Sequence, residues 1–79
     1  MKFNLQKLRY ERLSRKISQE KLALAIGVAR ATYQKKENGK IKISVGEFST
    51  ILDVLGISQS EAGNFFDLDV PVRELINNR

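Results

Sequence analysis

The sequence of 79 residues contains no cysteine and no histidine. Without cysteine the chain can form neither disulfides nor thiolate metal sites. Without histidine it lacks the commonest zinc ligand and the usual general base at neutral pH. The remaining residues contain no cluster of catalytic side chains, so we predict a protein that is not an enzyme and that needs no metal and no cofactor.

Long apolar runs and signal-like segments are also missing. No stretch approaches the roughly 20 apolar residues that a helix needs to cross a bilayer, and the N-terminus opens no apolar signal-peptide core. These absences predict a cytoplasmic protein that does not engage a membrane. The length predicts one domain with a small core, since a chain of this size buries only about 60% of the surface that it exposes when unfolded.

Proline is scarce, and its single occurrence at Pro71 leaves the preceding residues free to form helices. Four segments carry helical start and stop signals, and a fifth begins with the capping-box pattern Ser58-Gln59-Ser60-Glu61. Because no segment shows convincing strand alternation, we predict an all-α fold, a compact bundle of five helices. The expected helices span about residues 4–15, 18–26, 29–38, 44–55 and 58–66.

Local residues define the ends of these segments. Asn4, Ser18 and Ser44 are suitable N-caps, and Gly27 and Gly56 stand where a left-handed C-terminal residue is wanted. The helical signal fades after residue 66, so residues 1–66 are interpreted as the domain and 67–79 as a tail with an extra turn or a dimer contact. The stripes predicted to face the core are Leu22, Ala25 and Ile26 in one helix, and Phe48, Ile51, Leu52 and Leu55 in another.

Charges of the two signs are unevenly distributed along the chain. Residues 1–42 carry 12 Lys and Arg against 3 acids, whereas residues 43–79 carry 2 Arg against 6 acids. The net charges are therefore +9 and −4 within a total of +5. This asymmetry indicates a basic face for a polyanion and an acidic end kept away from it, although an ordinary solvated surface could have the same composition.

The most informative stretch is residues 19–38, which has the spacing of two helices joined by a tight turn. Ala23 stands where the two helices would cross closely, and Gly27 stands at the turn, where a positive φ is easy only for glycine. Val28 would fill the corner, and Tyr33 would anchor the second helix against the first. This spacing predicts two helices that cross at a steep angle.

These residues resemble the phage-repressor-like helix-turn-helix family, which includes Xre-type regulators, lambda repressor and Cro. The resemblance covers about residues 4–58. It departs from the family pattern where Ala29 replaces a common Ser or Thr, Tyr33 replaces Ile or Val, and Lys21 replaces an acid. The matched residues are Arg12, Ser18-Gln19-Glu20, Leu22-Ala23, Gly27-Val28 and Glu37-Asn38-Gly39-Lys40.

The resemblance implies a sequence-specific DNA-binding transcription regulator, most simply a repressor, with a recognition helix in the major groove. A pair between Arg12 and Glu37 would tie the first helix to the end of the recognition helix. Lys36 is predicted to be a solvated charge, and the other polar residues of this helix have the same plainer interpretation. The implied base contacts are Arg30, Ala31, Gln34 and Lys35, and the implied DNA backbone contacts are Gln19, Asn38, Lys40 and Lys42.

The implied partner is double-stranded DNA, bound at a near-palindromic site by a homodimer. An alternative is an antitoxin-like protein-interaction module that binds DNA and also holds a protein partner through the tail. RNA binding is disfavoured, because the sequence has no Arg-rich run and no aromatic stacking platform. Some candidates for the dimer surface must instead close the small core, and the sequence leaves open which of them do so: Val54, Leu55, Ile57, Phe65, Phe66 and Leu68.

Overall fold

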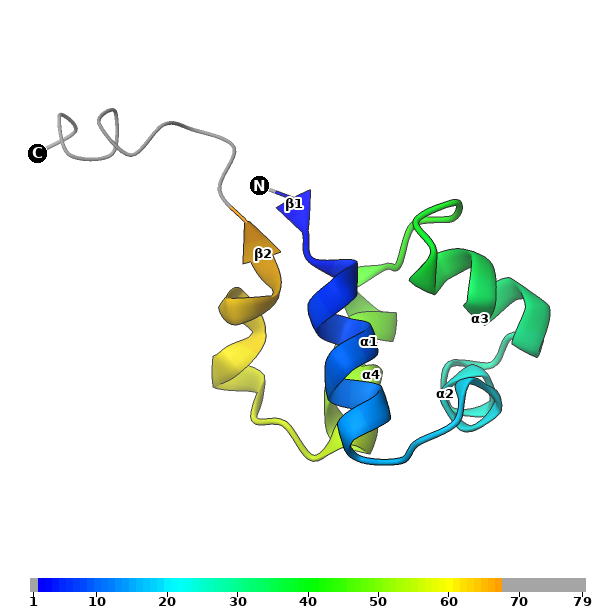
Figure 1. Ribbon diagram of the computed structural model, residues 1–79, viewed down its shortest axis with the longest axis horizontal. Helices are drawn as coiled ribbons and strands as arrows, with labels where there is room; N and C mark the ends of the chain where they lie inside the picture. The colour runs from blue at the N-terminus through cyan, green and yellow to red at the C-terminus, as the bar shows by residue number, and fades with distance from the viewer. Residues whose placement is uncertain (1, 68–79) are drawn as a thin grey trace, which may run out of the picture.

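The computed structural model of the chain describes residues 2–67. Four α-helices, one 3-10 helix and a two-stranded sheet make up this part, so the predicted all-α architecture of five helices is confirmed (Figure 1). The predicted tail, with its extra turn and the dimer candidate Leu68, lies outside the described residues. In chain order the elements are β1 (Lys2–Phe3), α1 (Leu5–Ser14), α2 (Gln19–Ile26), α3 (Arg30–Glu37), α4 (Val45–Leu55), η1 (Gln59–Phe65) and β2 (Phe66–Asp67).

The predicted caps define the helix ends. The side chains of Asn4 and Ser18 accept hydrogen bonds from the backbone N–H groups of Lys7 and Lys21. Ser44 forms the complete capping box with Glu47. At the other ends, the C-cap glycines of α2 and α4 adopt left-handed φ values of 74° and 75°. These local interactions satisfy backbone groups that a helix end would otherwise leave without partners.

The fifth helix differs from the prediction. It is a 3-10 helix, and Ser58 accepts from the backbone N–H of Ser60 instead of forming a capping box with Glu61. The chain then extends at once so that β2 pairs antiparallel with β1, with Phe3 opposite Phe66. Sequence alternation could not reveal strands of two residues, because a period of two needs a longer run to be visible.

The core lies where α2, α4, α1 and η1 meet. In Figure 1, α1 runs between η1 on one side and α2 and α3 on the other. Phenylalanine rings from β1, α4, η1 and β2 pack edge to face, with centroid distances from 4.8 to 5.9 Å. The buried apolar residues are Leu8, Leu22, Ala23, Tyr33, Phe48, Ile51, Leu52, Leu55, Ile57 and Phe65.

Burial corrects two sequence interpretations. Ala25, predicted to face the core, is exposed, whereas Ala23, predicted to lie at the helix crossing, is buried, because α2 turns that side toward α3 and α4. Leu55, Ile57 and Phe65 are at most 9% exposed and belong to the core cluster, so they do not form a dimer surface. Among residues 2–67, no helix is long and apolar enough to cross a membrane.

Candidate nucleic-acid interface

The two faces of α3 have different roles. Tyr33, Lys36 and Glu37 are buried on the inner face. The four residues proposed from the sequence to contact bases are all exposed, and their i, i+4 spacing places them side by side on the outer face: Arg30, Ala31, Gln34 and Lys35. A helix with such a polar outer face is held by its neighbours on one side and presents hydrogen-bonding groups on the other.

Tertiary contacts, not an N-terminal cap, hold α3 in place. Ala29 provides no side-chain hydrogen bond at the N-cap, as its replacement of the common Ser or Thr predicts. Tyr33 instead anchors the helix, since its ring is fully buried in the core cluster. Its hydroxyl donates to Glu37 Oε2 at 2.7 Å, which links the anchor to the last residue of the helix.

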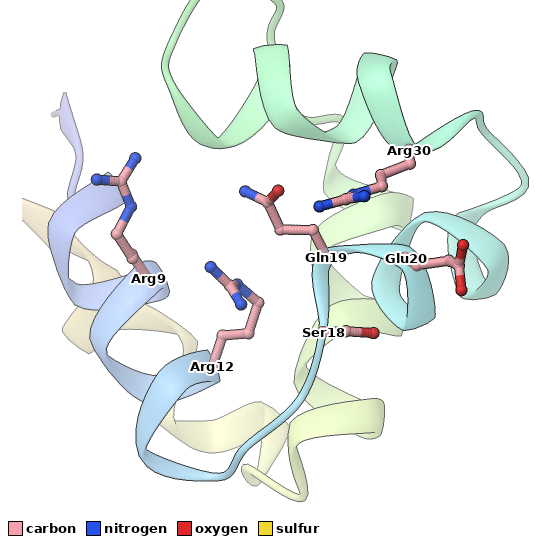
Figure 2. A pocket seen from close by; sticks show the side chains of 6 residues that line it. All are labelled: Arg9, Arg12, Ser18, Gln19, Glu20 and Arg30. Carbon is pink, nitrogen blue, oxygen red and sulfur yellow. The ribbon is translucent and has the colours of Figure 1, made fainter.

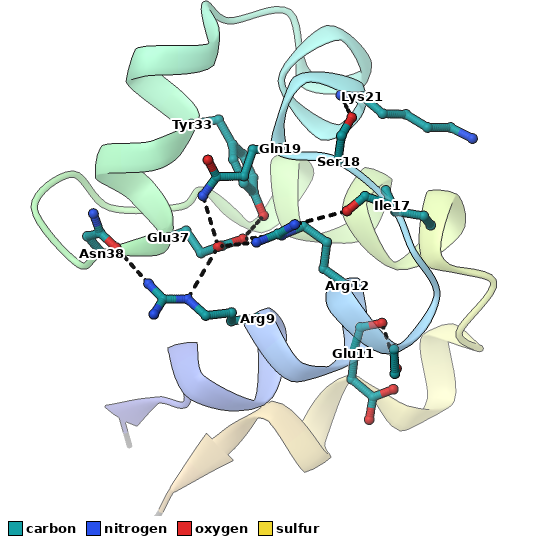
Figure 3. A network of polar contacts seen from close by, with 11 residues as sticks. Arg9, Glu11, Arg12, Ile17, Ser18, Gln19, Lys21, Tyr33, Glu37 and Asn38 are labelled. Atoms are coloured by element: carbon teal, nitrogen blue, oxygen red, sulfur yellow. Dashed lines mark hydrogen bonds and ion pairs between the residues drawn. The ribbon is translucent and has the colours of Figure 1, made fainter.

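The carboxylate of Glu37 connects three helices (Figure 3). Arg12 of α1 donates to it twice, from Nε at 2.9 Å and from Nη2 at 3.0 Å. Gln19 of α2 donates from Nε2 at 3.1 Å, and Arg9 Nε lies 3.5 Å from the same carboxylate. The pair predicted from the sequence is therefore present, with Arg12 only 8% and Glu37 only 1% exposed.

These donors keep Glu37 charged inside the protein. Burial by itself raises the pKa of this carboxyl, but hydrogen bonds from Arg12, Tyr33 and Gln19 outweigh burial and hold the pKa below its ordinary value. Burial also raises the pKa of the Tyr33 hydroxyl, and the neighbouring carboxylate raises it further. The hydroxyl thus remains a donor, and the polar cluster is satisfied at neutral pH.

A hollow of about 570 Å³ opens between α1, α2 and α3 (Figure 2). The side chains of Arg12, Gln19 and Arg30 point toward this space from three different helices, whereas Glu20 points away from it. The hollow also adjoins the start of α2, where the first backbone N–H groups have no intrahelical acceptor. Cationic side chains and free N–H groups together suit a phosphate group.

Sequence reasoning missed Arg9, which borders the same hollow. Its Nη2 donates to Asn38 Oδ1 at 2.7 Å. Since Arg9 occupies the amide oxygen, the amide nitrogen of Asn38 is directed to the other side, as a donor toward solvent (Figure 3). The helical spacing of Arg9 and Arg12 was the available signal, because residues three apart lie on the same face of a helix.

The loop from Asn38 to Ser44 carries Lys40 and Lys42, and both side chains are exposed. Lys36, predicted to be solvated, is instead only 8% exposed, and its Nζ bonds inside the protein. The available signal was again helical spacing, since Lys36 follows the anchor Tyr33 by three residues. Its placement on the inner face of α3 therefore corrects the sequence interpretation.

The predicted base contacts lie on the outer face of α3, and the predicted backbone contacts lie at the start of α2, at the end of α3 and in the loop that follows it. The residues predicted to contact the DNA backbone differ in whether their side-chain donors are available to a phosphate group, since the Gln19 amide already donates to Glu37. Of the dimer candidates within residues 2–67, Val54 and Phe66 remain partly exposed. No group of three or more metal-ligating side chains lies close together in this part of the chain.

The α2–α3 unit and the helices around it match a known protein family. The family described as helix-turn-helix matches the chain over residues 8–61, which extends from α1 into η1 and includes the whole α2–α3 unit. No curated protein and no solved structure matches the chain.

Proposed function

Because this chain belongs to the helix-turn-helix family of the Xre, lambda repressor and Cro type and is a DNA-binding regulator, we propose that it is a repressor that reads a short operator through α3. The single observation that carries the proposal is the outer face of α3. Four exposed side chains lie together on a helix whose inner face is anchored in the core. Such a rigid, polar helix fits the major groove of B-DNA.

Base reading would come from three polar side chains and one methyl group on the outer face of α3. Arg30 can donate two hydrogen bonds to a guanine edge, and Gln34 can pair with an adenine. The methyl group of Ala31 can contact a thymine methyl, and Lys35 can donate to a guanine. Because Arg30 also lines the hollow between the helices, it stands at the border between the base-reading face and the phosphate-binding region.

Phosphate contacts would flank α3 on both sides. On one side stand the backbone N–H groups at the start of α2, with Gln19 beside them. On the other side stand the Asn38 amide and the exposed ammonium groups of Lys40 and Lys42. Contacts of this kind set the register of a protein on the duplex, while the base contacts supply sequence preference.

We further propose that two copies of the chain bind a near-palindromic operator. One recognition helix covers few base pairs, and a single small module gains limited affinity over competing sites. A two-fold dimer reads two half-sites about 34 Å apart, and contacts with both half-sites add to its affinity and specificity. A repressor of this kind acts by occupying a promoter.

Selection of bound sequences from random duplex DNA tests the proposal. We expect one preferred motif, with an affinity that falls steeply as salt rises, because phosphate contacts release counterions. Arg30→Ala or Gln34→Ala should relax the preference at one base pair, with a loss of about 1–3 kcal/mol on the preferred site. Lys42→Ala should weaken all duplexes about equally. If selected and random duplexes bind alike, the proposal fails.

A further inference from the structure

Lys36 makes two contacts that its position on a DNA-binding helix does not require. Its Nζ donates to the backbone carbonyl of Lys42 at 2.9 Å and to Glu47 Oε1 at 3.1 Å. The side chain is 9% exposed, so the ammonium group is turned away from solvent. A cation in this position cannot itself reach a phosphate group, and its charge acts inside the protein.

Glu47 extends the bridge to the start of α4. Its Oε1 accepts from the backbone N–H of Ser44 at 3.0 Å, while its own backbone N–H donates to Ser44 Oγ at 3.1 Å. The bond from Ser44 N–H and the charge of Lys36 hold the pKa of Glu47 below its ordinary value, so the carboxylate stays ionised at neutral pH. One carboxylate thus joins the inner face of α3 to the N-cap of α4.

The bridge holds the far end of the loop that connects the two helices. The near end is held differently, by Lys35 O, which accepts from the N–H groups of Lys40 at 2.8 Å and Ile41 at 3.3 Å. Gly39 makes this turn with a φ of +83°. The backbones of Lys40 and Lys42 thus take part in the two attachments, while their side chains are exposed.

We propose that Lys36 and Glu47 are a positioning pair that holds the α3–α4 loop in the shape in which Lys40 and Lys42 meet the DNA backbone. This inference rests on the proposed function. A loop attached at one end only would have to become ordered when DNA binds, and that ordering lowers affinity. With both ends attached, the two ammonium groups are presented in advance, although the residues that present them contact no DNA.

A double-mutant cycle tests whether Lys36 acts through the loop. Lys36→Met should weaken duplex binding about fivefold or more, with unchanged base preference, while Lys36→Arg retains a donor and most of the affinity. The salt dependence should also become shallower, by about 0.9 in log–log slope for each phosphate group that the variant no longer binds. In a Lys40→Ala, Lys42→Ala background, Lys36→Met should cause no further loss. Additive losses would overturn the proposal.

A second pair of variants separates loop positioning from charge and from helix capping. Glu47→Ala removes one negative charge and so makes the net charge more positive, and simple electrostatics therefore predicts tighter DNA binding, whereas the proposal predicts weaker binding. Ser44→Ala also removes a capping bond of α4 but leaves the Lys36 bridge and the charge unchanged. It should therefore lower stability with little change in affinity. Tighter binding by Glu47→Ala would contradict the positioning role.

The outcomes distinguish this inference from the function on which it rests. If the unaltered chain shows no salt-sensitive duplex binding, the proposed function itself is wrong. If the unaltered chain binds and Lys36→Met binds equally well while remaining folded by circular dichroism, only the positioning role is wrong. If Lys36→Met does not fold, Glu47→Ala decides by the direction of its change in affinity.

Discussion

Single residues at the junction of α1, α2 and α3 combine structural and binding roles. Glu37 accepts from Arg12, Tyr33 and Gln19, and Arg9 lies against both Glu37 and Asn38. Two of the groups expected to meet phosphate, Gln19 and Arg9, therefore contact a buried carboxylate. We therefore expect the stability of this site and the geometry of the proposed DNA contacts to depend on the same side chains.

Arg12→Ala should destabilise the fold strongly. Arg12 and Glu37 form a buried pair, and removal of one partner leaves the other charge without compensation, which lowers the free energy of unfolding by about 3–5 kcal/mol. Arg15→Ala is the matched control, because Arg15 pairs with Glu11 at the surface. Arg15→Ala should lower the free energy of unfolding by less than about 1 kcal/mol. Urea denaturation measures both, and equal losses would contradict the importance of burial.

The Glu37 carboxylate should also make stability depend on pH. Its pKa in the folded state lies below the ordinary value of 4.5, so the folded protein binds this proton less readily than the unfolded chain. The resulting stabilisation is present above about pH 4.5 and is lost as the pH falls toward the lowered folded pKa.

Comparison with Glu37→Gln isolates this contribution. The difference in unfolding free energy between the unaltered chain and Glu37→Gln should be largest near neutral pH and should shrink below about pH 4. Glu11→Gln should show a smaller difference, since Glu11 pairs with Lys7 and Arg15 at the surface. Denaturant titrations from neutral to acidic pH test this, and a pH-independent difference for Glu37→Gln would contradict it.

At the scale of elements, glycine has opposite effects at the two ends of α4. Gly56 ends the helix with a φ of +75°, whereas Gly46 lies within the helix, and a Cβ at either position would meet no atom within 4 Å. Backbone conformation alone therefore separates the two sites. Gly56→Ala should lower the free energy of unfolding by about 1–2 kcal/mol, because a left-handed alanine is strained.

Gly46→Ala is the control for that substitution. Alanine in a helix restricts the unfolded chain and favours the folded conformation, so this variant should be about 0.5–1 kcal/mol more stable than the unaltered chain. The same chemical change then has opposite signs at the two ends of one helix. Thermal and urea unfolding measure the stability of the two variants. A change in the same direction for both would contradict this account.

At the scale of the whole molecule, the core takes up several apolar side chains from the C-terminal part of residues 2–67. Leu55, Ile57 and Phe65 close it, and among the described dimer candidates this leaves Val54 and Phe66 partly exposed. The dimer that we propose would therefore include Val54, on α4. An acidic residue at this position would place a charge in an apolar contact.

Val54→Glu should shift the protein from two chains toward one in sedimentation at micromolar concentration, and it should weaken operator binding. Val45→Glu introduces the same residue into the same helix, at a position that is 87% exposed. An acid is also favourable in the first turn of a helix, so this control should leave assembly and folding unchanged. A monomer that protects a single half-site in the unaltered chain would refute the dimer.

Local signals in the sequence predicted most of the fold. The caps Asn4, Ser18 and Ser44 and the glycines after α2 and α4 depend on interactions within a few residues, so they can be read without the tertiary structure. The four exposed residues on the outer face of α3 could also be predicted from the sequence, because helical spacing places them side by side. The Arg12–Glu37 pair was predicted from the family resemblance and not from local spacing, because 25 residues separate its two members.

Interactions between distant residues decided the rest. Periodicity does not say which neighbour will cover a side chain, so the sequence predicts a solvated Lys36 although Lys42 O and Glu47 surround its ammonium group. The role of Arg9 depends on its hydrogen bond to Asn38, which is 29 residues away in the sequence. The strands β1 and β2 exist only because folding brings the two ends of this domain together.

The sequence by itself determined the helices and the face that α3 presents, because those depend on local backbone physics. Only the tertiary structure decided that Lys36 is buried and which of the dimer candidates close the core, because burial depends on packing between elements that are far apart in the chain.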